Sequence, residues 1–115
     1  MDRLESIVRE RGLTVFARID HAAGAGDVGL SLRPTEVLIF GSARAGTPLM
    51  SARQTIGIDL PLKALVWQDA DHKTWIGYND PAWIVARHGA DAAVQAMAVG
   101  MSSLMATVAQ AAAAP

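Results

Sequence analysis

Two strand-like segments separated by four residues constrain the fold more than any other feature of this 115-residue chain. Leu60–Gln68 and Lys73–Asn79 are rich in aliphatic and aromatic residues, and the intervening Asp-Ala-Asp-His has the composition of a turn. Strands joined by so short a connection pair in the antiparallel sense, because a parallel crossover needs a dozen residues or more. The segment therefore predicts a β-hairpin.

The first third of the chain predicts two more strands and two helices. The apolar spacing before Gly12 is typical of the end of an amphipathic helix. Leu13–Ile19 and Thr35–Phe40 alternate or concentrate apolar residues as strands do. Between them, the glycine-containing segment Asp20–Arg33 predicts a short, irregular helix that stops before Pro34.

Thr47-Pro48 and Asp80-Pro81 each predict the start of a helix. Both pairs place a capping side chain at N-cap and a proline at the first helical position. We expect the first of these helices to run through Gln54 and to stop before Gly57. We expect the second to end at His88-Gly89.

The last 24 residues, Ala92–Pro115, contain no charged side chain. Their length would allow a membrane span. However, ten of them are alanine, and the larger apolar residues recur every three or four positions, as on one stripe of a docked helix. We therefore predict a helix over about 91–111, capped by Asp91 and packed on the core, with no membrane contact. The stripe consists of Val94, Met97, Met101, Leu104 and Val108.

Strands and helices mix without strict alternation, which favours the α+β class. We expect one domain over residues 1–115. Its sheet would be antiparallel, or mixed, with helices packed on one face. Four aromatic side chains lie in or near the hairpin, and core packing is the default expectation for them, with a ligand pocket or dimer surface as the alternative. They are Trp67, Trp75, Tyr78 and Trp83.

Composition excludes several classes of protein. Ten basic and eleven acidic residues give a net charge of −1, which argues against nucleic acid as a partner. The absence of cysteine excludes disulfides, thiolate metal sites and a cysteine nucleophile. Charged residues interrupt residues 1–20, which therefore do not resemble a signal peptide. We expect a cytoplasmic location.

Two glycine motifs resemble nucleotide-binding loops but lack essential parts. Gly24–Gly29 matches G-x-G-x-x-G, yet Pro34 follows too soon for the helix that would hold a pyrophosphate. Gly41–Thr47 has G-x-x-x-x-G spacing, yet a threonine stands where a phosphate-binding loop has lysine. The second motif still predicts a loop before a helix N-terminus, beside Arg44, where an anion or carboxylate could bind. The alternative is a capped turn with a solvated arginine.

The sequence identifies no catalytic or metal site. His21, His72 and His88 have no close ligand spacing, so we predict no metal and no cofactor. We also find no set of nucleophile, base and orienting group with a recognisable spacing. No catalytic residue is assigned.

Several segments together resemble a known family. They are Ile56–Trp67 (IGIDLPLKALVW), Tyr78–Pro81 (YNDP), Gly12–His21 and Leu38–Met50. The combination is similar to the family called domain of unknown function 302. The resemblance implies an α+β fold with four strands, arranged as in the TATA-box-binding-protein-like class, and homodimers. It implies no established activity. Relatives have a further strand before the first helix, and an uncovered sheet edge here would favour pairing with another chain.

Three hypotheses for function remain open. The first is a non-catalytic domain that binds a small ligand or anion and acts as a homodimer. The second is a structural or protein-interaction module, in which the same residues are caps and turns. The third is a hydrolase or isomerase that uses Asp20 or His21. The candidate binding residues of the first hypothesis are Arg44, Gly46, Thr47, His21, Asp20, Lys63 and Tyr78.

Overall fold

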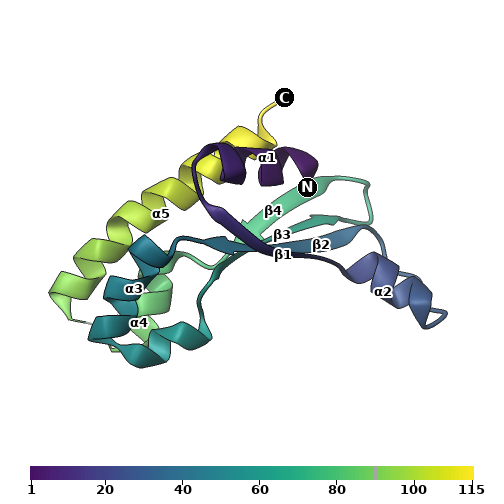
Figure 1. The fold of residues 1–115 in the computed structure, drawn as a ribbon. Coiled ribbons are helices and arrows are strands. Elements are labelled where there is room, and N and C mark those ends of the chain that lie inside the picture. Colours follow the sequence, from purple (N-terminus) through teal and green to yellow (C-terminus); the bar gives the residue numbers. More distant parts are fainter. Residues whose placement is uncertain (90) are drawn as a thin grey trace.

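The computed structural model describes residues 1–89 and 91–115 and has the α+β fold expected from the sequence (Figure 1). In chain order its elements are α1 (Asp2–Glu10), β1 (Thr14–Asp20), α2 (His21–Asp27), β2 (Thr35–Gly41), α3 (Ala43–Ala52), the 3-10 helix η1 (Gln54–Ile58), β3 (Leu62–Gln68), β4 (Thr74–Tyr78), α4 (Pro81–Arg87) and α5 (Ala92–Ala113).

The four strands form one antiparallel sheet in the order β1-β2-β3-β4. The predicted hairpin is present as β3 and β4, and its turn begins at Asp69, whose carboxylate accepts the backbone N–H groups of Asp71 and Lys73. The pairing of β1 with β2 shifts between Val15 and Ala17, which leaves Phe16 at a β-bulge. Each neighbour in the sheet is therefore also the next strand in the sequence.

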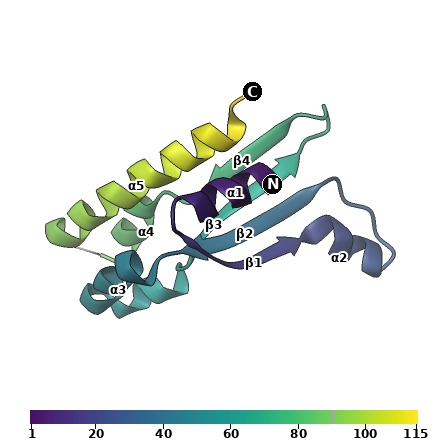
Figure 2. The same cartoon turned by 45° about the horizontal axis from the view of Figure 1, so that its top comes forward.

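Helices α1 and α5 lie over the same face of the sheet (Figures 1 and 2). Alternate residues of β2 and β3 point to that face and are buried. Helices α3 and α4 close one end of the sheet, whereas α2 lies at the other end. The core comprises Leu4, Val8, Leu38, Phe40, Leu49, Ile56, Leu62, Ala64, Val66, Ile84, Val85, Val94, Ala98, Met105 and Val108.

The opposite face of the sheet is apolar but only half-buried. Val37 pairs with Leu65, and Trp67 pairs with Trp75, on this side of the sheet. The Trp67 ring lies over Gly77, where an added Cβ would come within 3.1 Å of it. The two indoles stack with their centroids 6.4 Å apart. The default expectation of core packing is therefore wrong for these two tryptophans.

Helix α3 begins earlier than predicted. Ser42 is its N-cap and accepts the Ala45 N–H, so the segment expected to be a loop forms the first turns of the helix, and Pro48 lies inside it. An internal proline removes one helical hydrogen bond, but the carbonyl concerned belongs to the exposed residue Arg44, where water can replace the bond. The helix also ends earlier, at Ala52, and is followed by η1.

Helix α5 is docked on the domain core. It is the one described helix that is long and apolar enough to cross a membrane by length and composition. Val94, Ala98, Met105 and Val108 are buried against the other elements, and α5 packs on α1 and α4. The predicted stripe is correct except at Met97, which is 46% exposed.

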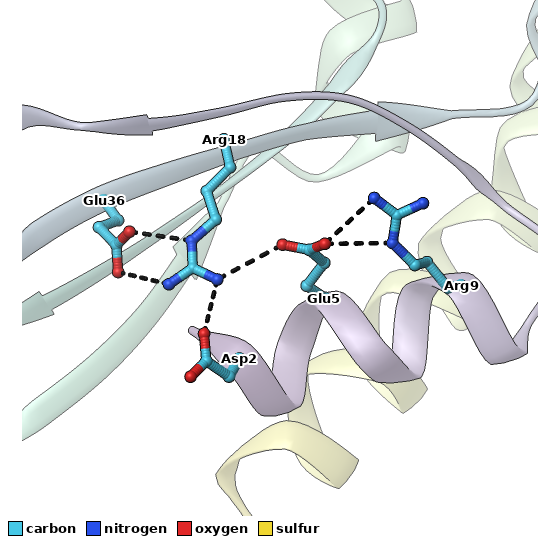
Figure 3. A network of polar contacts seen from close by, with 5 residues as sticks. All are labelled: Asp2, Glu5, Arg9, Arg18 and Glu36. Carbon is cyan, nitrogen blue, oxygen red and sulfur yellow. Dashed lines mark hydrogen bonds and ion pairs between the residues drawn. The ribbon is translucent and has the colours of Figure 1, made fainter.

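An ion-pair network joins α1 to the sheet (Figure 3). The Arg18 guanidinium donates two hydrogen bonds to the Glu36 carboxylate, at 2.9 and 3.1 Å, and one to Asp2 at 2.6 Å. Glu5 lies 3.4 Å from Arg18 and also pairs with Arg9. Hydrogen bonding to Arg18 lowers the pKa of Asp2, and its carboxylate partners raise the pKa of Arg18.

Replacing Arg18 should reduce stability in a pH-dependent manner. Because the pKa of Asp2 is lower when folded, its contribution is present above its unfolded pKa, about 4, and disappears as the pH falls through the folded value. The free energy of unfolding of Arg18→Gln should therefore fall furthest below wild type near neutral pH, and the gap should narrow below about pH 4. Urea titrations at several pH values measure this gap, and Arg11→Gln, which removes a positive charge outside this network, is the control. A gap independent of pH would contradict the assignment.

A candidate ligand pocket beside helix α3

A pocket of about 220 Å³ lies against one face of α3. Ala43, Gly46, Thr47 and Met50 line it, and this spacing of three and four residues defines a single helical face. Gly46 is buried there, and a Cβ on it would lie 3.4 Å from the Leu60 side chain. A larger residue at Gly46 would therefore press on the opposite wall.

The other walls come from three distant parts of the sequence. Phe16 stands at the bulge of β1 and is 56% exposed. Leu60 and Pro61, joined by a cis peptide bond, form the segment that enters β3. Met101 comes from α5. The pocket is thus lined mainly by aliphatic, aromatic and thioether groups, with the hydroxyls of Ser42 and Thr47 at its polar edge.

The structure places two of the predicted site residues on the wall of the pocket. Gly46 and Thr47 line the pocket. Arg44 is exposed on the first turn of α3, three residues before Thr47, and does not line the pocket. The predicted connection between β2 and a helix N-terminus is therefore present, although that N-terminus lies at Ser42.

The remaining predicted residues lie elsewhere. Asp20 and His21 stand at the far end of β1, because Thr14 is the residue of that strand that pairs with Gly41. Six residues of strand correspond to about 20 Å. Asp20 caps α2 there by accepting the Ala23 N–H.

Lys63 and Tyr78 do not line the pocket either. Lys63 pairs with Ile39 and is exposed on the open face of the sheet. Tyr78 pairs with Ala64, which points to the helix-covered face, and packs against the core. Sequence reasoning missed Phe16, Met50 and Met101, because a scan for polar motifs does not select apolar walls.

The pocket lining contains few polar side chains. Among the residues that line it, none is a carboxylate, histidine or lysine. Within residues 1–89 and 91–115, no group of three histidine, aspartate or glutamate side chains is placed to hold a metal ion. Apolar surface with few polar groups is typical of sites for small organic ligands.

Comparison with known proteins adds the family. The sequence model described as "Domain of unknown function DUF302" matches residues 1–108. A solved structure of an uncharacterized conserved DUF302 protein from Bacillus stearothermophilus superposes with a TM-score of 0.86, at 21% identity, over 96% of this chain and 86% of that protein. This likeness shows that the two proteins share a fold.

Two curated relatives have names that refer to a membrane function. "Fluoride-specific ion channel FluC 1" of Brucella suis biovar 1 (strain 1330) is 44% identical over 108 residues, which cover 90% of this chain and 42% of the relative. The protein of the same name from Brucella abortus biovar 1 (strain 9-941) is also 44% identical, over 90% of this chain and 40% of the relative. The chain thus spans less than half the length of these relatives. On the match to residues 1–108, the chain belongs to the DUF302 family.

Proposed function

We propose that this protein is a cytoplasmic ligand-binding domain that acts as a homodimer, and that the pocket itself is non-catalytic. The observation that carries the proposal is the pocket beside α3, whose wall combines Phe16, Met50 and Met101 with the hydroxyls of Ser42 and Thr47. Its volume of about 220 Å³ lies below the roughly 300–1,000 Å³ of sites for drug-sized ligands, so the proposed ligand is a molecule of few heavy atoms. Methionine side chains adapt to ligand shape at little cost, which suits such a wall.

The proposed ligand is a small organic acid with an apolar body. The apolar part would lie between α3 and Met101, where little water needs to be displaced from polar groups. A carboxylate at the rim would lie near Arg44, which is exposed and carries the one positive charge in the first turn of α3. A guanidinium is suited to carboxylates because it can donate two parallel hydrogen bonds.

Filling the pocket should abolish binding without disturbing the fold. Ala43 lines the pocket and is exposed, so Ala43→Leu adds three carbons to the cavity side of α3. Ala45 is exposed on the same helix but does not line the pocket, which makes Ala45→Leu the matched control. We expect short- and medium-chain carboxylates to raise the melting temperature of wild type and Ala45→Leu, but not that of Ala43→Leu.

The expected stabilisation is about 2.7 kcal/mol at a ligand concentration of 100 times Kd. Arg44→Ala should weaken binding of the acids and leave the matched alcohols unaffected. Equal responses of the two leucine variants would exclude this pocket. Equal affinity of Arg44→Ala and wild type for the acids would exclude the role of the guanidinium.

The open face of the sheet supports the proposed homodimer. Ile19 is 42% and Trp75 is 49% exposed on this face. Ile19 pairs with half-buried Val37, and Trp75 pairs with half-buried Trp67. Four strands present roughly 400 Å² in projection, about half of what one partner contributes to a standard interface. The exposed apolar residues in the α2–β2 connection extend this surface at one end of the sheet. They are Val28, Leu30 and Leu32.

Trp75→Ala should convert the dimer to monomer. Buried tryptophans at interface centres commonly contribute 2 kcal/mol or more, or about a 30-fold change in Kd. Trp83 on α4 is similarly exposed, at 53%, but lies off the sheet, so Trp83→Ala is the control. Sedimentation equilibrium measures both variants. A wild-type monomer at micromolar concentration would refute the homodimer, and a Trp75→Ala dimer would refute this face.

A second candidate function follows from the curated relatives. The match covers 42% of a Brucella suis protein named as a fluoride-specific ion channel, so 58% of that protein lies outside the match. We propose as the alternative that the domain docks on such a channel. Liposomes that carry the unmatched part of that relative should co-sediment with this chain, whereas empty liposomes should not. Equal recovery with both would contradict this proposal.

A further inference from the structure

Three side chains outside the pocket, Thr55, His88 and Asp59, are connected by hydrogen bonds where η1 meets the end of α4. We call this set the relay. The Thr55 hydroxyl oxygen lies 3.0 Å from His88 Nδ1. On the other side of the imidazole, His88 Nε2 lies 2.6 Å from Asp59 Oδ2. The imidazole thus connects a hydroxyl to a carboxylate through its two ring nitrogens. None of the three residues lines the pocket beside α3.

The hydrogen bonds select one form of the neutral imidazole. A carboxylate only accepts hydrogen bonds, so Nε2 must carry the proton that is donated to Asp59. Nδ1 then holds a free electron pair, and it accepts the Thr55 O–H. This is the order of groups by which a histidine removes a proton from a hydroxyl nucleophile while a carboxylate orients the ring.

Neighbouring groups fix the carboxylate end of the relay. Arg87 donates to the second oxygen of Asp59 at 3.3 Å, and its guanidinium lies over the Trp83 ring, 5.1 Å from the centroid. Arg53 Nη2 donates to the carbonyl oxygen of Gly89, the residue after His88, at 3.0 Å. This bond ties the segment before η1 to the residue that follows His88.

The three side chains of the relay differ in their exposure to solvent. The side chains of His88 and Asp59 are 12% and 16% exposed, so water competes little for their hydrogen bonds. Thr55, at the other end, is exposed to solvent and can be reached by a substrate. The base is thus shielded, whereas the hydroxyl is accessible.

We propose that Thr55 is an activated nucleophile that hydrolyses small activated carboxylic esters. His88 Nδ1 takes the hydroxyl proton as Thr55 Oγ bonds to the ester carbonyl carbon. The bond from that carbon to the leaving oxygen then breaks, and the leaving alcohol receives the proton from Nδ1. Water then gives a proton to the same nitrogen and adds to the acyl carbon. The bond from that carbon to Thr55 Oγ breaks, Thr55 Oγ regains the proton from Nδ1, and the acid is released. Asp59 is a positioning residue, because it acts through His88.

Acetylation by p-nitrophenyl acetate tests this site in the intact protein. We expect release of nitrophenolate and an acetyl group on Thr55, located by mass spectrometry of the peptide that contains it. His88→Gln should lower the acetylation rate by about 100-fold or more. Asp59→Asn should also lower the acetylation rate, because Asp59 orients His88. Thr55→Ser should retain acetylation, whereas Thr55→Val, which keeps the side-chain shape, should abolish it at that position.

A purely structural role makes a different set of predictions. The same hydrogen bonds tie η1 to the end of α4, so His88→Gln and Thr55→Val could reduce stability; circular dichroism and melting temperature identify any variant that does not fold. The conservative Thr55→Ser variant keeps the hydrogen bond and controls for this effect. A folded wild type that carries no acetyl-Thr55 and releases nitrophenolate no faster than Thr55→Val would overturn the proposal. An acetylation rate unchanged in folded His88→Gln would overturn it equally.

Discussion

Burial of one face of the antiparallel sheet is the constraint on which the rest of the structure depends. Leu38 and Phe40 of β2 and Leu62, Ala64 and Val66 of β3 are all buried on the face that α1 and α5 cover. Side chains alternate along a strand, so covering one face leaves the intervening residues on the other. Because α1 and α5 both lie on the same side of the sheet, the opposite face stays apolar and half-exposed. It is thereby available for contact with another molecule.

The same packing explains why the candidate site contains mostly residues that no motif indicates. Ser42 and Thr47 both carry a hydroxyl that can cap the N-terminus of α3. The sequence favours Thr47 as the N-cap, because proline at the next position is typical of the first residue of a helix. In the folded chain, Gly46 is buried against Leu60, and a segment with free backbone N–H groups would be costly there. The helix therefore extends back to Ser42. That extension turns one face of α3 towards the pocket.

Several polar side chains that the sequence suggested for one binding site lie instead at the ends of separate helices and strands. Asp80 and Asp91 were predicted correctly as N-caps, since such caps depend on neighbours within three residues. The clustering of Asp20 with Arg44 was not found, because the two lie near opposite ends of the sheet. His88 was expected only at the end of a helix, whereas its partners Thr55 and Asp59 come from η1 and the residue that follows it, about thirty positions earlier.

The sequence by itself determined the α+β class, the hairpin with its turn at Asp69, and the docked C-terminal helix, because these follow from hydrophobic spacing and local hydrogen bonding. Tertiary structure decided which face of the sheet is covered, where α3 begins, and which distant residues meet. Phe16, Pro61 and Met101 line one pocket although they are far apart in the chain. Such contacts depend on the register and packing of whole elements, which spacing along a single segment does not encode.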